Sequence, residues 1–209
     1  MTTSALVLFG IYLGVGFGLR TYIQVRRTGD SGFRGISGSF GTAEWWAGTL
    51  FVVALAAGVL GLISASLGVE PLGALSAPVI QWTGVVVTLV GIVATFVTQL
   101  EMGTSWRIGV DQTEHTDLVT TGPFALVRNP IFSAMAATGA GLAFMVPNVV
   151  SLLGLLLLMV ALELQVRVVE EPFLRRLHGT DYESYAARVG RFLPSLGRLA
   201  HSAPARVVG

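Results

Sequence analysis

One stretch constrains the fold of this chain more than any other. The 34 residues from 129 to 162 carry no formal charge, and only Pro147-Asn148 interrupts their apolar character. A turn at this dipeptide would fold the stretch into a helical hairpin and bring its two ends together. The ionisable residues at those ends are Arg128 on one side and Glu163, Arg167, Glu170 and Glu171 on the other. The sequence therefore predicts a polar cluster at one membrane surface, with apolar helices behind it.

The composition of the whole chain is also typical of a membrane protein. Hydrophobic residues make up 53% of the chain and charged residues 12%, whereas a soluble domain has about 25% charged residues. The net charge of +1 gives no electrostatic reason to expect nucleic-acid binding. The chain has no cysteine, and its three histidines are scattered without the spacing of metal ligands, so no metal site is expected.

Five apolar segments have the character of membrane helices. They are expected at about 3–24, 44–66 and 78–100, followed by a hairpin with arms at 131–146 and from 148 through Leu174. The first arm of the hairpin is short for a full span. The predicted fold is an all-α polytopic membrane protein of about five helices, of which the last two form a helical hairpin.

Glycines in the first segment predict one of its packing faces. Gly10, Gly14 and Gly18 recur every four residues and would form a smooth stripe for close helix contact. Packing within the chain is the preferred interpretation, and dimerisation is the alternative.

The distribution of arginine predicts the orientation in the membrane. All 13 basic residues are arginines: four lie between the first two helices, two in 101–130 and seven from Arg167 onward, with none in the other two connections. The positive-inside rule then places the N-terminus outside and the C-terminus and polar cluster in the cytoplasm. The small size and the arginine bias suggest a bacterial inner-membrane protein.

Five motifs in the C-terminal half occur in a distinctive order. They are LVTTGPFALVRNPIF (118–132), VPN (146–148), EEPFL (170–174), HGTDYESY (178–185) and RFLP (191–194). Together they resemble the isoprenylcysteine carboxyl methyltransferase family of integral membrane enzymes, which includes bacterial relatives and phospholipid methyltransferases. The resemblance covers about residues 100–194. It divides the chain into three N-terminal helices (1–100), a catalytic region (101–194) and a flexible tail (195–209).

The resemblance implies a methyltransferase that uses S-adenosyl-L-methionine, yields S-adenosylhomocysteine and has no Rossmann fold. The cofactor would lie at the cytoplasmic face, enclosed by the hairpin and the C-terminal segment. The residues that the resemblance places around it are Thr116, Leu118, Val119, Gly122, Phe124, Asn129, Pro130, Phe132 and Glu170. Arg128 could bind either the cofactor or phosphate headgroups, and Tyr182 could be either part of a cofactor lid or an interfacial anchor.

Three residues in the last part of the second hairpin arm are candidates for the chemistry itself. On an α-helix, Glu163, Arg167 and Glu170 would share one face. Arg167 could grip a carboxylate acceptor, whereas Glu163 or Glu170 could accept a proton from an amine acceptor. An ion-paired ladder that lets the helix leave the membrane is the structural alternative. The sequence does not choose between these roles.

Three departures from the family pattern leave the substrate open. Asn129 replaces the family histidine, Phe132 replaces a tyrosine, and His178-Gly179 replaces Phe-Gly. Asparagine does not titrate, so a proton shuttle at position 129 is excluded. The expected acceptor is a lipophilic small molecule or lipid that enters from the bilayer. An NADPH-dependent sterol or enone reductase and a non-catalytic membrane scaffold are the alternatives.

Overall fold

The computed structural model describes residues 1–110 and 115–199, and all the regular structure in these ranges is helical. Four of its helices are long and apolar enough to cross a membrane: Thr2–Thr28, Ala43–Ser66, Pro78–Glu101 and Val149–Arg188. A fifth apolar helix, Pro130–Met145, is shorter. The prediction of an all-α polytopic membrane protein is confirmed.

The long helices consist of the following elements. The first helix contains α1 (Thr2–Leu13), the π-helical turn η1 (Gly14–Leu19) and α2 (Arg20–Thr28); α3 spans Ala43–Ser66 and α4 spans Pro78–Glu101. The hairpin contains α5 (Pro130–Met145) and α6 (Val149–Leu164), and α6 continues through a second π-helical turn, η5 (Gln165–Glu170), into α7 (Glu171–Arg188). The 3₁₀ turns η2 (Gly73–Leu75), η3 (Gly103–Ser105) and η4 (Gly122–Ala125) lie in the connections.

Local sequence signals explain where these helices begin and end. Thr42 caps α3 by accepting a hydrogen bond from the Trp45 amide, and proline occupies the first position of α4 and of α5. Asn148 caps α6 through Oδ1, while its Nδ2 donates to the Gly61 carbonyl of α3 at 2.9 Å. The hairpin turn is therefore attached to α3 as well as to its own helix.

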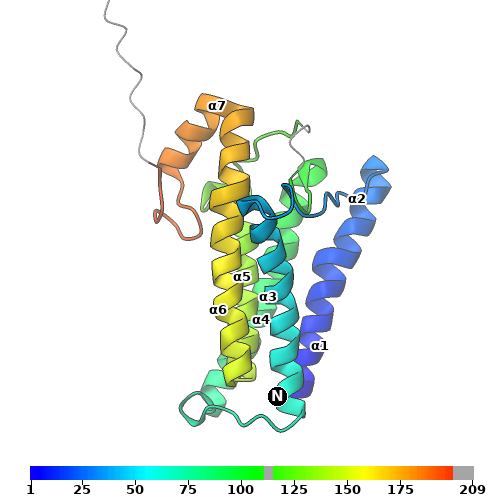
Figure 1. Ribbon diagram of the computed structural model, residues 1–209, viewed down its shortest axis with the longest axis vertical. Coiled ribbons are helices and arrows are strands. Elements are labelled where there is room, and N and C mark those ends of the chain that lie inside the picture. Colours follow the sequence, from blue (N-terminus) through cyan, green and yellow to red (C-terminus); the bar gives the residue numbers. More distant parts are fainter. Residues whose placement is uncertain (111–114, 200–209) are drawn as a thin grey trace, which may run out of the picture.

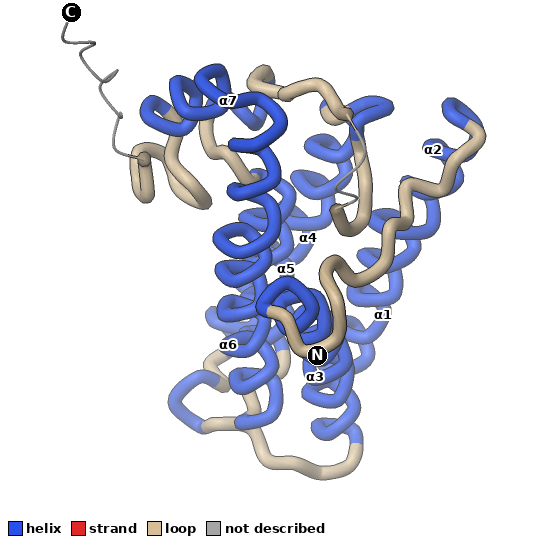
Figure 2. The backbone as a smooth tube through the Cα atoms, turned by 45° about the horizontal axis from the view of Figure 1, so that its top comes forward, coloured by secondary structure: helices blue, strands red, loops and turns tan. Residues whose placement is uncertain are grey.

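The helices form two closely packed pairs, α4 with α5 and α3 with α6, and α1 packs against α3, α4 and α5 (Figures 1 and 2). The hairpin turn and the 67–77 connection meet at the end opposite α7, where the Leu72 amide donates to the Pro147 carbonyl at 2.7 Å. The described connections that carry arginine all lie at the other end, near α2 and α7 (Figure 1).

The α4–α5 pair packs through small residues. An added Cβ at Gly84 would lie 2.6 Å from the Gly141 carbonyl oxygen and 2.8 Å from the Met145 amide nitrogen. Both are backbone atoms, which cannot rotate away as a side chain would. The two helix backbones are therefore in direct contact, as small residues allow in membranes.

Replacing Gly84 by alanine is expected to lower the thermal stability of the detergent-purified protein. The methyl group must push two backbones apart, and overpacking of this kind costs about 1–3 kcal/mol. Gly10→Ala is the matched control, because a Cβ at Gly10 meets nothing within 4 Å. Equal melting temperatures for the two variants would contradict the packing described here.

Candidate active site

A cavity of about 390 Å³ lies at the arginine-rich end of the bundle. Its walls come from the segments at 105–110 and 116–132, from η5 and α7, and from residues of the first helix, α3 and α4. Ten of the eleven residues predicted around the cofactor line it: Thr116, Leu118, Val119, Phe124, Arg128, Asn129, Pro130, Phe132, Glu170 and Tyr182. Gly122 does not line the cavity, and its backbone lies against the side chain of Glu101.

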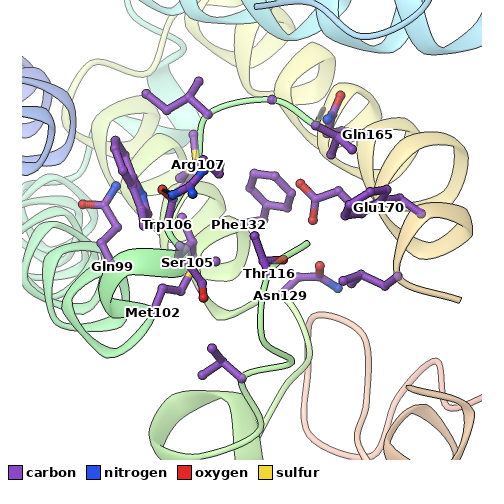
Figure 3. Close-up of a pocket in the computed structure, with 18 of the residues that line it drawn as sticks. Gln99, Met102, Ser105, Trp106, Arg107, Thr116, Asn129, Phe132, Gln165 and Glu170 are labelled. Atoms are coloured by element: carbon purple, nitrogen blue, oxygen red, sulfur yellow. Dashed lines mark hydrogen bonds between the residues drawn. The ribbon is translucent and has the colours of Figure 1, made fainter. Parts of the chain in front are cut away.

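Glu170 is the acidic residue that η5 contributes to this cavity. Its side chain is half-buried, and Figure 3 shows its carboxylate directed toward Phe132 and Thr116. The residue ends a π-helical turn, in which hydrogen bonds join i to i+5 and the wall of the helix is widened. Turns of this kind are frequent at functional sites.

The structure does not bring Glu163 and Arg167 into the cavity lining. Their side chains are 40% and 57% exposed and form an ion pair with each other. The shared face expected for Glu163, Arg167 and Glu170 assumed an uninterrupted α-helix. Because the π-helical turn changes the helical phase between Gln165 and Glu170, the structure separates Glu170 from the other two residues.

Asn129 presents a hydrogen-bond acceptor to the cavity. Its Nδ2 donates one hydrogen bond, to the Arg191 carbonyl at 3.1 Å, which leaves the side-chain oxygen and the second N–H available to a ligand. Figure 3 shows this carboxamide close to Thr116, on the same side of the cavity as Glu170. This end of the cavity therefore carries a carboxylate and a carboxamide oxygen.

Behind this end, Glu171 joins two arginines in a buried cluster. Its Oε1 lies 3.0 Å from Nη1 of Arg128 and 2.7 Å from Nε of Arg191, and its Oε2 accepts from Nη2 of Arg191 at 3.1 Å. The hydrogen bonds that Arg191 donates to Glu171 raise the pKa of Arg191, which therefore stays cationic. Arg128 also donates to the Tyr182 hydroxyl and to the Gly197 carbonyl. The adjacent glutamates of the EEPFL motif thus have different environments, which their sequence position did not reveal.

One buried donor of this cluster has no partner. Nε of Arg128 makes no hydrogen bond within the described residues, although Arg128 lines the cavity. A buried donor without an acceptor costs about 1–3 kcal/mol. An anionic group of a ligand would satisfy it.

The segment after α7 is hydrogen-bonded to the backbone of residues 128 and 129, beside the cavity. Helix α7 bends at Gly179, where φ is 51°, and the chain then returns to form a β-bridge between Val127 and Gly190. The buried Tyr185 donates through its hydroxyl to the Phe124 carbonyl at 2.6 Å. Residues 195–199, at the start of the predicted flexible tail, include hydrogen-bonded backbone groups, and residues 200–209 lie outside the described residues.

The opposite wall of the cavity was not singled out from the sequence. Gln99, at the end of α4, lines it together with Ser105, Trp106 and Arg107 (Figure 3). Gln99 is an uncharged polar residue near the end of an apolar span, and this was the feature of the sequence that could have indicated the wall. No group of three or more His, Asp or Glu side chains suitable for a metal occurs in the part of the chain that the structure describes.

The fold and the cavity define an integral membrane protein with a candidate ligand site at one end of a helical bundle. Residues 79–181 match the family model described as phospholipid methyltransferase. Over this region the chain belongs to the family of isoprenylcysteine carboxyl and phospholipid methyltransferases, which indicates a membrane methyltransferase of lipid-like substrates. No curated protein and no solved structure gives a significant match.

Proposed function

We propose that the protein transfers a methyl group from S-adenosyl-L-methionine to a lipophilic acceptor that enters from the bilayer. The observation that carries the proposal is that Glu170 and Arg128 line the same cavity, and that Nε of Arg128 has no hydrogen-bond partner within the described residues. A carboxylate and a guanidinium suit the two charged ends of an amino-acid group. Both side chains lie within the family-matched region.

The residues at this end of the cavity fit the chemistry of the cofactor. Glu170 would bind the ammonium group, with the Asn129 carboxamide as a second acceptor, and Arg128 would bind the carboxylate. The apolar side chains of Leu118, Val119 and Phe132 would contact the adenine. The cavity volume of about 390 Å³ lies within the range of small-molecule sites, about 300–1,000 Å³.

The cofactor supplies a methyl group on a positively charged sulfur, and the transfer is an in-line displacement. The protein therefore has to align two reactants and exclude water. Tyr182 and Tyr185 are buried at the wall formed by α7. Their rings pack edge to face, with 6.3 Å between the ring centroids. They would shield the reacting atoms from water. A carboxylate acceptor would need only orientation for this step, whereas an amine acceptor would also need a general base to take its proton.

The predicted catalytic residues thus divide into two groups. The proposal gives Glu170 direct contact with the ligands. It assigns Glu163 and Arg167 no such contact, because they form an exposed ion pair outside the cavity lining.

Calorimetry on the detergent-purified protein would test the proposal with S-adenosyl-L-methionine, S-adenosylhomocysteine and NADPH as ligands. Micromolar binding of the first two, and not of the third, is the expected result. Binding of NADPH alone would instead establish the reductase alternative. Binding of none of the three would leave the scaffold alternative in place.

The proposed orientation, with the cavity in the cytoplasm and the N-terminus outside, can be tested by cysteine labelling. The chain has no cysteine, so single-cysteine variants have no background. Ser39 and Ala74 are exposed residues in connections at opposite ends of the bundle. In intact cells a membrane-impermeant maleimide is expected to label Ala74→Cys and to leave Ser39→Cys unlabelled until the cells are opened. The reverse pattern would invert the orientation.

A further inference from the structure

Arg20 is a buried cation at the junction of η1 and α2. Its relative exposure is 0%, and no carboxylate pairs with it in the described part of the chain. Removing a charge from water costs several kcal/mol unless other groups compensate. Such a residue within an apolar helix is a functional candidate.

The groups around Arg20 all belong to the end of α4 and the turn that follows it, apart from Gln24. Nε donates to the Gln99 carbonyl at 3.2 Å and Nη2 to the Gly103 carbonyl at 2.5 Å, while Nη1 donates to Gln24 at 3.0 Å. Carbonyls at a helix C-terminus carry partial negative charge, which stabilises a cation. The guanidinium also lies 4.5 Å from the centre of the Trp106 ring, within range of a cation–π interaction.

Residues 20–37 make the main hydrogen bonds that hold the segment 102–110 in place. Gln24 is fully buried and donates to the Thr104 carbonyl at 3.1 Å, and the Ile108 amide donates to the Gly32 carbonyl at 2.8 Å. Ser37 donates to the Val110 carbonyl at 3.0 Å. At Gly32, where φ is +73°, an added Cβ would lie 3.1 Å from the Trp106 carbonyl oxygen. Residues 20–37 therefore set the position of the cavity wall at 102–110.

The wall at 102–110 faces the part of the cavity away from the proposed cofactor residues. Figure 3 shows Trp106 and Gln99 on one side and Glu170 and Asn129 on the other, with Phe132 between them. Phe51, Val52 and Leu55 of α3 add apolar surface to the same cavity. Apolar surface of this kind suits a lipophilic acceptor. Residues 20–37 and α3 precede the family-matched region, which begins at residue 79.

We propose that Arg20 is a positioning residue for the acceptor: its guanidinium fixes Trp106 and the turn at 102–107, so that the first helix sets the affinity for the lipophilic substrate. This inference rests on the proposed methyltransferase function. It assigns Arg20 no contact with either ligand, since Arg20 does not line the cavity. Acceptor affinity should then depend on a part of the chain that the family match does not include.

The test compares Arg20→Met with Arg20→Lys and with Arg27→Met, which removes an exposed arginine of the same helix. Trp45, Trp46 and Trp82 are replaced by phenylalanine in every protein, so that Trp106 is the only tryptophan and can be excited selectively. Three quantities are measured for each: acrylamide quenching of Trp106, the affinity for S-adenosylhomocysteine, and transfer of labelled methyl groups to a total lipid extract of the host membrane.

For Arg20→Met we expect stronger quenching of Trp106 and a tenfold higher lipid concentration at half-maximal transfer. The affinity for S-adenosylhomocysteine should stay within twofold, Arg20→Lys should recover most of the loss, and Arg27→Met should match the parent. The inference is overturned if Arg20→Met leaves quenching unchanged, or if cofactor affinity falls as much as transfer does. A parent that binds no S-adenosylhomocysteine overturns the proposed function instead, and the quenching comparison still decides whether Arg20 orders Trp106.

Discussion

Replacing Glu170 by glutamine is expected to weaken binding of S-adenosylhomocysteine about 100-fold. The change keeps the shape of the side chain and removes the negative charge that would bind the ligand ammonium. A hydrogen bond to a charged group contributes about 1.5–3 kcal/mol, which corresponds to roughly 10- to 150-fold in affinity. Calorimetry on the purified protein measures the change directly.

Glu163→Gln is the matched control for this experiment. Glu163 lies on the same continuous helix, but its side chain is 40% exposed and pairs with Arg167 outside the cavity lining. Its substitution should leave the affinity within twofold of the parent. If both variants bind equally well, Glu170 is not a ligand residue and the proposed placement of the cofactor fails.

Replacing Glu171 by glutamine is expected to destabilise the protein by about 3–5 kcal/mol, the usual cost of breaking a buried ion pair. The Glu171 side chain is 7% exposed and contacts both Arg128 and Arg191. Without its charge, two buried guanidiniums lie close together, and only the partly exposed Glu163, 3.7 Å from Nη1 of Arg191, remains to compensate them. Thermal unfolding in detergent, followed by the loss of helical signal or by aggregation, measures the effect.

Glu183→Gln on the same helix is the control, because Glu183 is exposed. Its melting temperature should equal that of the parent. A normal melting temperature for Glu171→Gln would show that the cluster does not hold the C-terminal segment in place. Limited proteolysis adds a local readout: cleavage within 189–199 should increase in Glu171→Gln and not in Glu183→Gln.

The membrane helices could be predicted closely from the sequence. The third was expected at 78–100 and is found at Pro78–Glu101, and the hairpin arms were expected at 131–146 and from 148 and are found at Pro130–Met145 and from Val149. These boundaries are set by local signals, namely long apolar runs bounded by proline and a capping asparagine. Such signals do not depend on which helix lies next to which.

The packing faces could not be predicted in the same way. Gly10, Gly14 and Gly18 were expected to form a contact stripe within the chain, but an added Cβ at any of them meets nothing within 4 Å. Gly16, on the other face, lies against Thr95 of α4, and its carbonyl accepts a hydrogen bond from Gln99. A spacing of four shows that glycines share a face, but it does not show where that face points.

The π-helical turns are the other feature that the sequence did not reveal. One precedes Arg20 and the other ends at Glu170, and each alters the direction in which the following side chains project. An α-helical period applied to Glu163, Arg167 and Glu170 therefore placed all three together. The helices beside the proposed site were predicted from the sequence. The position of the wall at 102–110 could not be predicted, because it depends on tertiary contacts with residues 20–37.

The return of the chain at Gly179 has a consequence for biosynthesis. Residues 189–199 hold Arg128 through Gly190 and Gly197, and they follow both arms of the hairpin in the sequence. Synthesis therefore completes the hairpin before it supplies Arg191, which shares Glu171 with Arg128. We expect the buried cluster behind the proposed site to form only after both hairpin arms have been made.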